Sequence, residues 1–287
     1  MEISLRLKEI ANMVDKCESV VDVGTDHAYI PIYLIKNNIC KSAIAADINK
    51  GPLDRAKNNI NSHRLQSKIQ CRLGTGLTKI HPKEVNSAVI AGMGGHLIKD
   101  ILEESKEVFK TLDFLVLQPV QNPEALRKHI YSMGYKILKE SLVFEDNRFY
   151  EIIKIKYDEN PKSVDSIYYE IGEYLINTKH PLIKKFLYNN IDKYQKILKY
   201  ITEDTESAAL RKSEIKQKII KIGGAGKMHL NVKNIENIIE EHAPLYLKES
   251  YDNVGLMIGD SRATVNKILV ALDCYLRCNR RGKGKGV

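Results

Sequence analysis

The stretch Val20-Val21-Asp22-Val23-Gly24-Thr25-Asp26-His27-Ala28-Tyr29-Ile30-Pro31 decides the fold of this chain. Its β-branched start predicts a short buried strand, which Gly24 ends. Asp26 is placed to cap a helix that follows. An acid near the end of a first strand, then a glycine, then a helix, is typical of the ligand corner of an open α/β sheet. An acid-rich turn that binds nothing is the alternative for this stretch taken alone.

The residues of this corner indicate which ligand it suits. A dinucleotide fingerprint needs three glycines, and here only Gly24 is present. Asp22 and Asp26 would repel phosphates at a helix start that otherwise attracts anions. The corner therefore favours a cationic or neutral nucleoside. S-adenosylmethionine fits, because it has an amino group and a sulfonium but no phosphate.

Length and composition limit the class of protein. The 287 residues suffice for one large domain or two modest ones. No apolar run approaches about 18 residues, and the N-terminus lacks the apolar core of a signal peptide, so we expect a soluble, cytoplasmic protein with no membrane partner. Five scattered cysteines fit a reducing compartment, and Cys274 and Cys278 lack the partners of a metal site. The net charge of +9 fits a polyanionic partner or an ordinary lysine-rich surface.

Strands and helices alternate through the first 156 residues. Helices are predicted at 5–14, at 29–36, from Gly51-Pro52 onward and at 123–133. Strands are predicted at 20–23, 42–47, 69–73, 86–91, 114–117, 135–144 and 148–156. This order predicts an α/β fold with a mostly parallel sheet and an antiparallel edge.

Two further turns at strand ends carry residues that suit a ligand. Asp47 follows Gly24 by about twenty residues, the spacing at which a carboxylate receives ribose hydroxyls. An acid that ends a strand is otherwise a common turn residue. Gly92-Met93-Gly94-Gly95 follows a central strand, where it either lets the backbone approach a ligand or simply makes a tight turn.

From about Lys156 the pattern is helical only. Apolar residues keep three-to-four spacing to Ile201 and, after a polar turn at 202–207, continue to Ile222, which predicts an antiparallel helical hairpin. Its lysine-rich exposed positions fit either RNA phosphates or a solvated helix face. The glycine-rich segment 223–227 predicts a short flexible linker.

With these residues in hand, residues 1–222 resemble the bacterial tRNA (adenine-N1) methyltransferase family of TrmK type. The segments that carry the resemblance, in the family's order and spacing, are Asp22–Pro31, Asp47–Pro52, Ala91–Gly95 and Leu117-Gln118-Pro119. The resemblance implies a Rossmann-like class I S-adenosylmethionine-dependent methyltransferase sheet over 1–156. It also implies a coiled-coil domain over 157–222 that binds tRNA, and methylation of adenine 22.

The resemblance also implies roles for individual residues. The expected cofactor-binding residues are Asp22, Gly24, His27, Asp47, Ile48, Thr75, Gly76, Leu77, Gly92, Met93 and Gly94. Asp26 is the candidate catalytic residue, with a helix N-cap as its alternative role. The expected RNA contacts are Tyr29, Gln118, Lys193, Lys196 and Lys199. Thr75 departs from the pattern, since many members carry an acid there, and a threonine is a neutral and weaker acceptor for the adenine amine of the cofactor.

Residues 228–273 resemble the N-terminus of a different family, the GTP cyclohydrolase type 2 homologues (NGG-interacting-factor-like proteins). The matching segments are Ala243-Pro244, Tyr251–Gly259 and Lys267–Asp273. The metal ligands of that family lie further along than this segment reaches. We therefore expect 228–287 to be a truncated second unit, joined by a fusion or a frameshift, with no metal chemistry.

Two functions from other classes stay open on the sequence alone. One is a non-catalytic nucleoside- or RNA-binding module, and the other is an S-adenosylmethionine-dependent methyltransferase of a small molecule. A basic, elongated helical appendage has no evident use for a small substrate. This favours methylation of tRNA.

Overall fold

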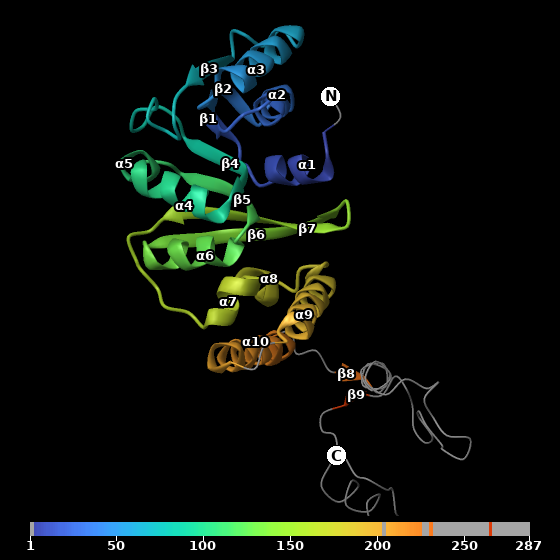
Figure 1. The fold of residues 1–287 in the computed structure, drawn as a ribbon. Coiled ribbons are helices and arrows are strands. Elements are labelled where there is room, and N and C mark those ends of the chain that lie inside the picture. The colour runs from blue at the N-terminus through green and yellow to red at the C-terminus, as the bar shows by residue number, and fades with distance from the viewer. Residues whose placement is uncertain (1–2, 203–204, 226–229, 232–263, 266–287) are drawn as a thin grey trace, which may run out of the picture. The chain divides into compact units, whose positions relative to one another are not determined.

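The computed structural model describes residues 3–202, 205–225, 230–231 and 264–265 (Figure 1). Residues Met1–Gly226 form one compact unit and Lys227–Val287 form a second. In the second unit the described residues are two short antiparallel strands, β8 (Leu230–Asn231) and β9 (Thr264–Val265). The pair Cys274 and Cys278 lies outside the described residues. The boundary predicted at 156/157 falls inside the first unit.

The first unit alternates strands and helices along most of its length. Its strands are β1 (Cys17–Val23), β2 (Cys40–Asp47), β3 (Ile69–Leu73), β4 (Ser87–Gly94), β5 (Phe114–Gln121), β6 (Tyr135–Glu145) and β7 (Arg148–Tyr157). Its helices are α1 (Leu5–Asn12), α2 (Tyr29–Lys36), α3 (Lys50–Ser62), α4 (Gly95–Glu104), α5 (Lys106–Phe109), α6 (Pro123–Ser132), α7 (Ser166–Ile171), α8 (Glu173–Asn177), α9 (Ile183–Tyr200) and α10 (Glu206–Ala225).

The strands form one sheet in the order β3-β2-β1-β4-β5-β7-β6. The first five of these are parallel to their neighbours, β7 runs antiparallel to β5, and β6 runs antiparallel to β7. In register, Val23 lies between Ala46 of β2 and Ile90 of β4. The predicted parallel sheet with an antiparallel edge is therefore confirmed.

Helices cover both faces of the sheet (Figure 1). Successive side chains of each buried strand point to opposite faces, so apolar residues on both faces have to be covered. Val21 and Val23 of β1 share a core with α4, α5 and α6, while Val20 shares the other core with α1, α2 and α3. The helices that follow β1 and β4 thus lie on opposite faces. The strand order reverses between these two strands, and such a point leaves a crevice at their carboxyl ends.

Arg127 of α6 is fully buried and ties the sheet to the helices that follow it. Its Nε lies 2.7 Å from Oε1 of Glu140, and its Nη2 lies 2.6 Å from Oε2 of Glu151. Its Nη1 donates to the backbone carbonyl of Tyr169 in α7 over 3.1 Å. Gly172, at φ +86°, packs so close that a Cβ there would lie 2.5 Å from Oε2 of Glu140. Removing one partner of a buried ion pair costs about 3–5 kcal/mol, so the Arg127 side chain is held firmly against the sheet, and its hydrogen bond to Tyr169 connects α7 to it.

Three details differ from the expectations. Asp26 does not cap a helix, because α2 begins after Ala28, which has a left-handed φ of +54° and makes no side-chain cap. The helical pattern before Ile201 is divided among α7, α8 and α9: Gly172, with its positive φ, separates α7 from α8, and Lys179 at φ +51° lies between α8 and α9. The helix α10 continues through Gly223 to Ala225, where a linker was predicted. A helical glycine costs only about 1 kcal/mol, and Ile222 just before it is buried.

Candidate functional site

A cavity of about 380 Å³ opens at the carboxyl ends of β1 and β4. Its walls come from α1, from the segment that follows β1 and from the end of β4. The lining residues are Arg6, Leu7, Asp22, Gly24, Thr25, Asp26, His27, Ala28, Tyr29, Ile30, Ala91 and Gly92. The structure therefore brings six of the expected site residues into one cavity, and its size suits one small ligand.

Asp22 is the buried acid of this cavity, with 6% of its surface exposed. Burial raises the pKa of its carboxyl from 3.8 to about 6, and the negative charge of Asp47 adds to the rise. A carboxylate that is ionised while buried needs a cation or hydrogen-bond donors beside it. The cavity is therefore suited to a ligand that carries a positive charge.

Asp26 is exposed at the mouth of the cavity and pairs with side chains on both sides. Its Oδ1 accepts from Nε of Arg55 in α3 over 2.9 Å, and Nη2 of Arg55 forms an ion pair with the same oxygen. Its Oδ2 lies 3.4 Å from Nε2 of His27. Nδ2 of Asn59 donates to the backbone carbonyl of His27 over 2.7 Å. Two contacts from α3 thus hold the loop that presents Asp26.

The rings of His27 and Tyr29 stack with their centroids 5.1 Å apart and their planes inclined by 15°. Tyr29 is 41% exposed, so one face of this pair is open to solvent. Flat aromatic surfaces of this kind are suited to stacking against a nucleobase. The structure therefore places the expected RNA contact Tyr29 beside the expected cofactor contact His27.

Two glycine turns bring the backbone close to the cavity. Gly24 has a φ of +78° and Gly92 a φ of +77°, a conformation that side chains other than glycine rarely adopt. A Cβ on Gly24 would lie 2.1 Å from Cε of Met93, so the Met93 side chain rests against this turn. Gly94 is followed directly by α4. Gly24 and Gly92 both line the cavity, and neither residue places a side chain of its own between the backbone and that space.

Asp47 ends β2, next to the turn that follows β1. Its Oδ1 accepts from the backbone N–H of Asn49 over 2.7 Å, and its backbone carbonyl accepts from Gly74 over 3.0 Å. Its neighbour Ile48 is 60% exposed. Neither residue lines the cavity, but the charge of Asp47 influences the pKa of Asp22. Asp47 therefore lies close to the buried acid, at the next strand end.

The segment Thr75–Leu77 follows β3 and lies outside the cavity lining. Thr75 is exposed, and its backbone carbonyl accepts from the N–H and the hydroxyl of Thr78. Leu77 is 1% exposed and belongs to the core under α4. Of Leu77, only the backbone is available to a ligand.

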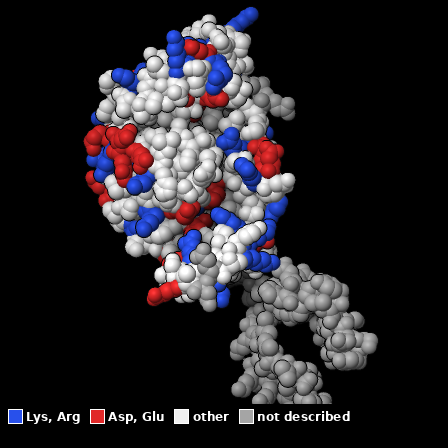
Figure 2. Space-filling model, in the orientation of Figure 1, with Lys and Arg blue, Asp and Glu red and all other residues white. Residues whose placement is uncertain are grey.

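The lysine-rich helices are the remaining part of the predicted site. The helix α9 carries five lysines and one acid, Asp192. Figure 2 shows basic side chains gathered over α9 and α10, whereas acidic ones gather over α4 and α5. Lys193, Lys196 and Lys199 are exposed. Lys196 pairs with Asp192 at 2.7 Å, an exposed contact that stabilises little.

Two lysines of α10 form ion pairs with acidic side chains of this chain. Lys218 forms an ion pair with Glu170 of α7, and Lys221 lies 2.8 Å from Asp165. The hydroxyl of Tyr194 in α9 donates to the same Glu170 over 2.6 Å. These contacts join α9 and α10 to α7.

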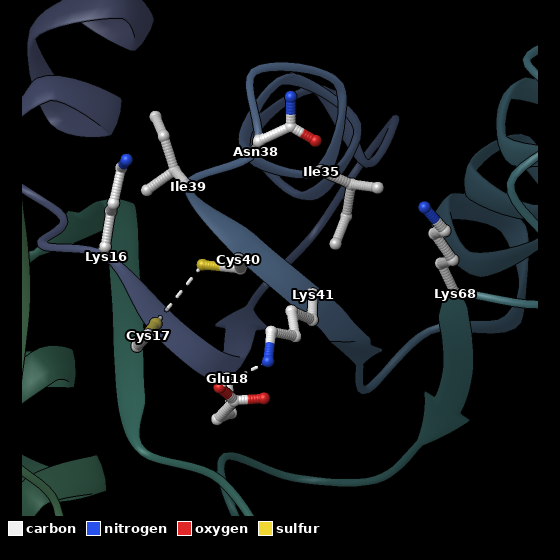
Figure 3. Close-up of a pocket in the computed structure, with 9 residues that line it drawn as sticks. All are labelled: Lys16, Cys17, Glu18, Ile35, Asn38, Ile39, Cys40, Lys41 and Lys68. Atoms are coloured by element: carbon white, nitrogen blue, oxygen red, sulfur yellow. Dashed lines mark hydrogen bonds and ion pairs between the residues drawn. The ribbon is translucent and has the colours of Figure 1, made fainter.

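A second cavity, of about 580 Å³, lies at the amino ends of β1 and β2 (Figure 3). Cys17 and Cys40 are neighbours in register there, with their Sγ atoms 3.2 Å apart, and Lys16, Lys41 and Lys68 also line the space. The hydrogen bond from Cys40 lowers the pKa of Cys17 to about 7 and raises that of Cys40. This cavity is at the opposite edge of the sheet from the first and does not belong to the candidate site.

In the described part of the chain, no group of three or more His, Cys, Asp or Glu side chains is arranged to hold a metal ion. Among the helices at the described positions, none is both long and apolar enough to traverse a bilayer.

Arg6, Leu7, Arg55 and Asn59 belong to the site but were not predicted from the sequence. Arg6 and Leu7 come from α1, ahead of the first strand, and reach the cavity only because α1 packs beside β6 and β7. Arg55 and Asn59 lie one turn apart on α3. No local motif marks any of the four.

The strand order, with its antiparallel β7 and its cavity after β1 and β4, is that of a Rossmann-like class I methyltransferase. Residues 20–224 match the family described as TrmK, tRNA (adenine(22)-N(1))-methyltransferase. The chain belongs to this family.

Individual relatives agree with this assignment. The tRNA (adenine(22)-N(1))-methyltransferase of Bacillus subtilis is 30% identical over 221 residues, which cover 75% of this chain and 93% of the relative. The crystal structure of B. subtilis TrmK superimposes with a TM-score of 0.71, at 29% identity, over 78% of this chain and 99% of that one. Sp1610 of Streptococcus pneumoniae, solved in complex with S-adenosyl-L-methionine, gives a TM-score of 0.67 at 32% identity, over 78% and 100%.

The end of the chain matches a second family. Residues 230–286 match the family described as Duf34/NIF3 (NGG1p interacting factor 3). A GTP cyclohydrolase 1 type 2 homolog of Clostridium acetobutylicum is 60% identical over 49 residues, which cover 17% of this chain and 18% of that relative. The predicted junction of two families is therefore confirmed, and the chain spans about a fifth of this second relative.

Proposed function

We propose that this chain transfers a methyl group from S-adenosylmethionine to N1 of adenine 22 in tRNA. The observation that carries the proposal is the buried Asp22 carboxylate beside the bare backbone turns at Gly24 and Gly92. Membership of the TrmK family supports adenine 22 as the target.

The residues of the cavity fit S-adenosylmethionine. Asp22 would hold the amino group of its methionine part, and Asp47 would accept from the ribose hydroxyls. The backbone at Gly24 and Gly92 leaves room for a nucleoside because neither residue has a side chain. Ile48 and the backbone of 75–77 would lie along its adenine. When bound, this cofactor supplies an electrophilic methyl group on a positively charged sulfur.

The acceptor sets the chemical task of the protein's own residues. Adenine N1 is a weak nucleophile, and its methylation leaves a positively charged ring. The protein must therefore position the base and then stabilise that charge or accept a proton from the exocyclic amine. Asp26, at the cavity mouth between Arg55 and His27, is our candidate for this second role.

The target adenine must also reach the cavity. A base paired in the tRNA core has to leave its stack, which costs a few kcal/mol. The stacked pair His27 and Tyr29 offers an exposed aromatic face at the cavity mouth that can compensate part of this cost. Gln118, an expected RNA contact, is fully buried, so in this proposal it would act on the RNA only through a neighbour such as Arg6.

The helices α9 and α10 are the proposed tRNA-binding part. Lys193, Lys196 and Lys199 are exposed at three-residue spacing, which places them along one side of α9. Lysine ammonium groups arranged in this way bind phosphates and release counterions. The coiled-coil geometry expected for this region stays a prediction.

Transfer of a tritiated methyl group to unmodified tRNA tests the proposal. The full chain should label a tRNA transcript with adenine at position 22 and should not label a matched transcript with guanine there. Mapping of the product should place the label on N1 of adenine 22. Labelling of a small molecule but not of tRNA, or cofactor binding with no transfer, would support the alternative classes.

A further inference from the structure

Arg6 lies in the first turn of α1 and reaches the rim of the cavity. Its Nη1 donates to Oε1 of Gln118 over 2.8 Å, and its guanidinium carbon lies 5.2 Å from the centre of the Tyr150 ring. The backbone N–H groups of Leu5 and Arg6 donate to the carboxylate of Glu145 over 2.7 and 3.4 Å. Contacts from β5, β6 and β7 thus fix both the backbone and the side chain of Arg6.

The guanidinium is held directly over the end of β4. Its Nη1 would lie 3.8 Å from a Cβ built on Gly92, whose φ is +77°. Gly92 lines the same cavity as Asp22 and Asp26. Arg6 therefore lies at the rim of the cavity into which, under the proposed function, the target base would be inserted.

The charges around the cavity indicate what Arg6 is for. Asp22, Asp26 and Asp47 make the site suited to a cationic cofactor, but they would repel the phosphates of an approaching RNA. Arg55 offsets only the charge of Asp26, with which it forms an ion pair. Among the ion pairs between described residues, Arg6 takes part in none, and its contact with the neutral Gln118 uses one of five guanidinium N–H donors.

We propose that Arg6 binds a phosphate next to the target adenosine and so holds that nucleotide at the cavity. Gln118 and Tyr150 are positioning residues, since they act by orienting the guanidinium. The planar guanidinium suits this task because it forms paired hydrogen bonds with phosphate oxygens. The inference rests on the proposed function, because the phosphate belongs to the tRNA substrate.

Single-turnover methylation over a series of tRNA and salt concentrations tests this role. The variant Arg6→Gln should weaken tRNA binding about 10-fold or more, and the slope of log affinity against log salt should flatten by about one phosphate contact. The affinity for S-adenosylmethionine, measured by calorimetry, should stay within about twofold. Arg6→Lys should retain part of the binding. Lys8→Gln removes one exposed charge from the same helix and is the matched control.

A substrate change identifies the phosphate itself. A tRNA that carries a neutral methylphosphonate at the phosphate beside adenine 22 should bind the wild-type protein as weakly as Arg6→Gln binds normal tRNA. The two changes together should weaken binding no further than either alone. Additive effects at both flanking phosphates, or an unchanged salt slope in Arg6→Gln, would overturn the assignment. Absence of transfer by the wild-type protein would instead overturn the proposed function.

Discussion

The guanidinium of Arg55 holds the carboxylate of Asp26, with Nε donating to Oδ1 over 2.9 Å. This contact joins the first turn after β1 to the helix after β2. It orients Asp26 at the cavity mouth but also competes with a substrate for the same oxygen. In its proposed role, Asp26 would accept a proton from the target amine through Oδ2, the oxygen nearer His27, or through Oδ1 after the pair with Arg55 has opened.

Replacement of the Asp26 charge separates chemistry from binding. Asp26→Asn keeps the size of the side chain, so cofactor affinity should persist while single-turnover methylation falls about 10²–10⁴-fold, as for a lost general base. Asp54→Asn, which removes an acid from α3, is the control and should leave the rate unchanged. Equal rates in Asp26→Asn and the wild-type protein would leave Asp26 with only an orienting role.

The buried, ionised Asp22 should lower the stability of the fold while strengthening cofactor binding. Its raised pKa, about 6 against 3.8, means that the native state binds the proton more tightly than the unfolded chain. The ionised carboxyl therefore destabilises the fold above pH 6, by about 3 kcal/mol, and this penalty disappears as the pH falls toward 4. Asp22→Asn should raise the melting temperature more at pH 8 than at pH 4.5 and should weaken cofactor binding.

Differential scanning calorimetry at the two pH values checks this expectation. Asp100→Asn, an exposed site on α4, is the control and should show no such pH difference. In the wild-type protein, cofactor affinity should decline as the pH drops through 6, because the ligand amine needs the ionised carboxylate. A melting temperature lowered equally at both pH values by Asp22→Asn would contradict the assignment.

Asp47 should contribute through the ribose of the cofactor. Asp47→Ala should weaken binding by one or two charge-assisted hydrogen bonds, about 1.5–3 kcal/mol each. Asp47→Asn keeps an acceptor for the backbone N–H of Asn49, so this variant should lose less cofactor affinity than Asp47→Ala. Titration calorimetry with S-adenosylhomocysteine and its 2′-deoxy analogue distinguishes the contributions. Loss of the 2′-hydroxyl should weaken ligand binding to the wild-type protein and should hardly change binding to Asp47→Ala.

The lysines of α9 should govern the salt dependence of tRNA binding. Replacing Lys193, Lys196 and Lys199 together with Gln should weaken binding and flatten the salt slope by about 2–3. Glutamine keeps helix propensity, so the helix should survive. Filter binding over a salt series measures the slope. Its control is the triple replacement of the lysines that line the cavity at the amino ends of β1 and β2, Lys16, Lys41 and Lys68. Equal slopes for the two triple variants would remove α9 from the RNA-binding surface.

The thiol pair in Figure 3 should make Cys17 more reactive than the other described cysteines. With a pKa lowered to about 7 by Cys40, Cys17 should react with iodoacetamide at a rate that rises through pH 7 and levels near pH 8. Cys71, whose pKa is raised by burial, should react much more slowly at the same pH. Mass spectrometry of peptides follows both sites. Cys40→Ala, which removes the hydrogen-bond donor, should move the Cys17 profile to higher pH, and an unmoved profile would contradict this origin of the lowered pKa.

The sheet and the centre of the site could be predicted because their signals are local. The run Val20–Val23 and the glycine after it define a strand end, and Asp22, Gly24 and Asp26 share the cavity as the corner pattern indicates. The start of α2 could not be predicted this way, since a left-handed Ala28 leaves no side-chain cap to recognise.

The site residues that the sequence did not predict depend on contacts between positions far apart in the chain. Arg6 meets Gln118 across 112 positions, and Arg55 meets Asp26 across 29. The helical region shows the same limit, because the pairing of Lys218 with Glu170 spans 48 positions. Apolar spacing identified α9 and α10 as helices, but not which of their cations are already neutralised.

The buried cluster around Arg127 has a consequence for how a nucleotide is chosen. It joins α7 to the sheet by an ion pair and a backbone contact, and Lys218 and Tyr194 in turn join α10 and α9 to α7. The lysines of α9 are thereby held at a set separation from the cavity. A tRNA bound along α9 would offer to the cavity only the nucleotide that lies at this distance. The cluster would then determine which nucleotide is methylated by its distance from the bound part of the folded RNA, with no contact to the bases around that nucleotide.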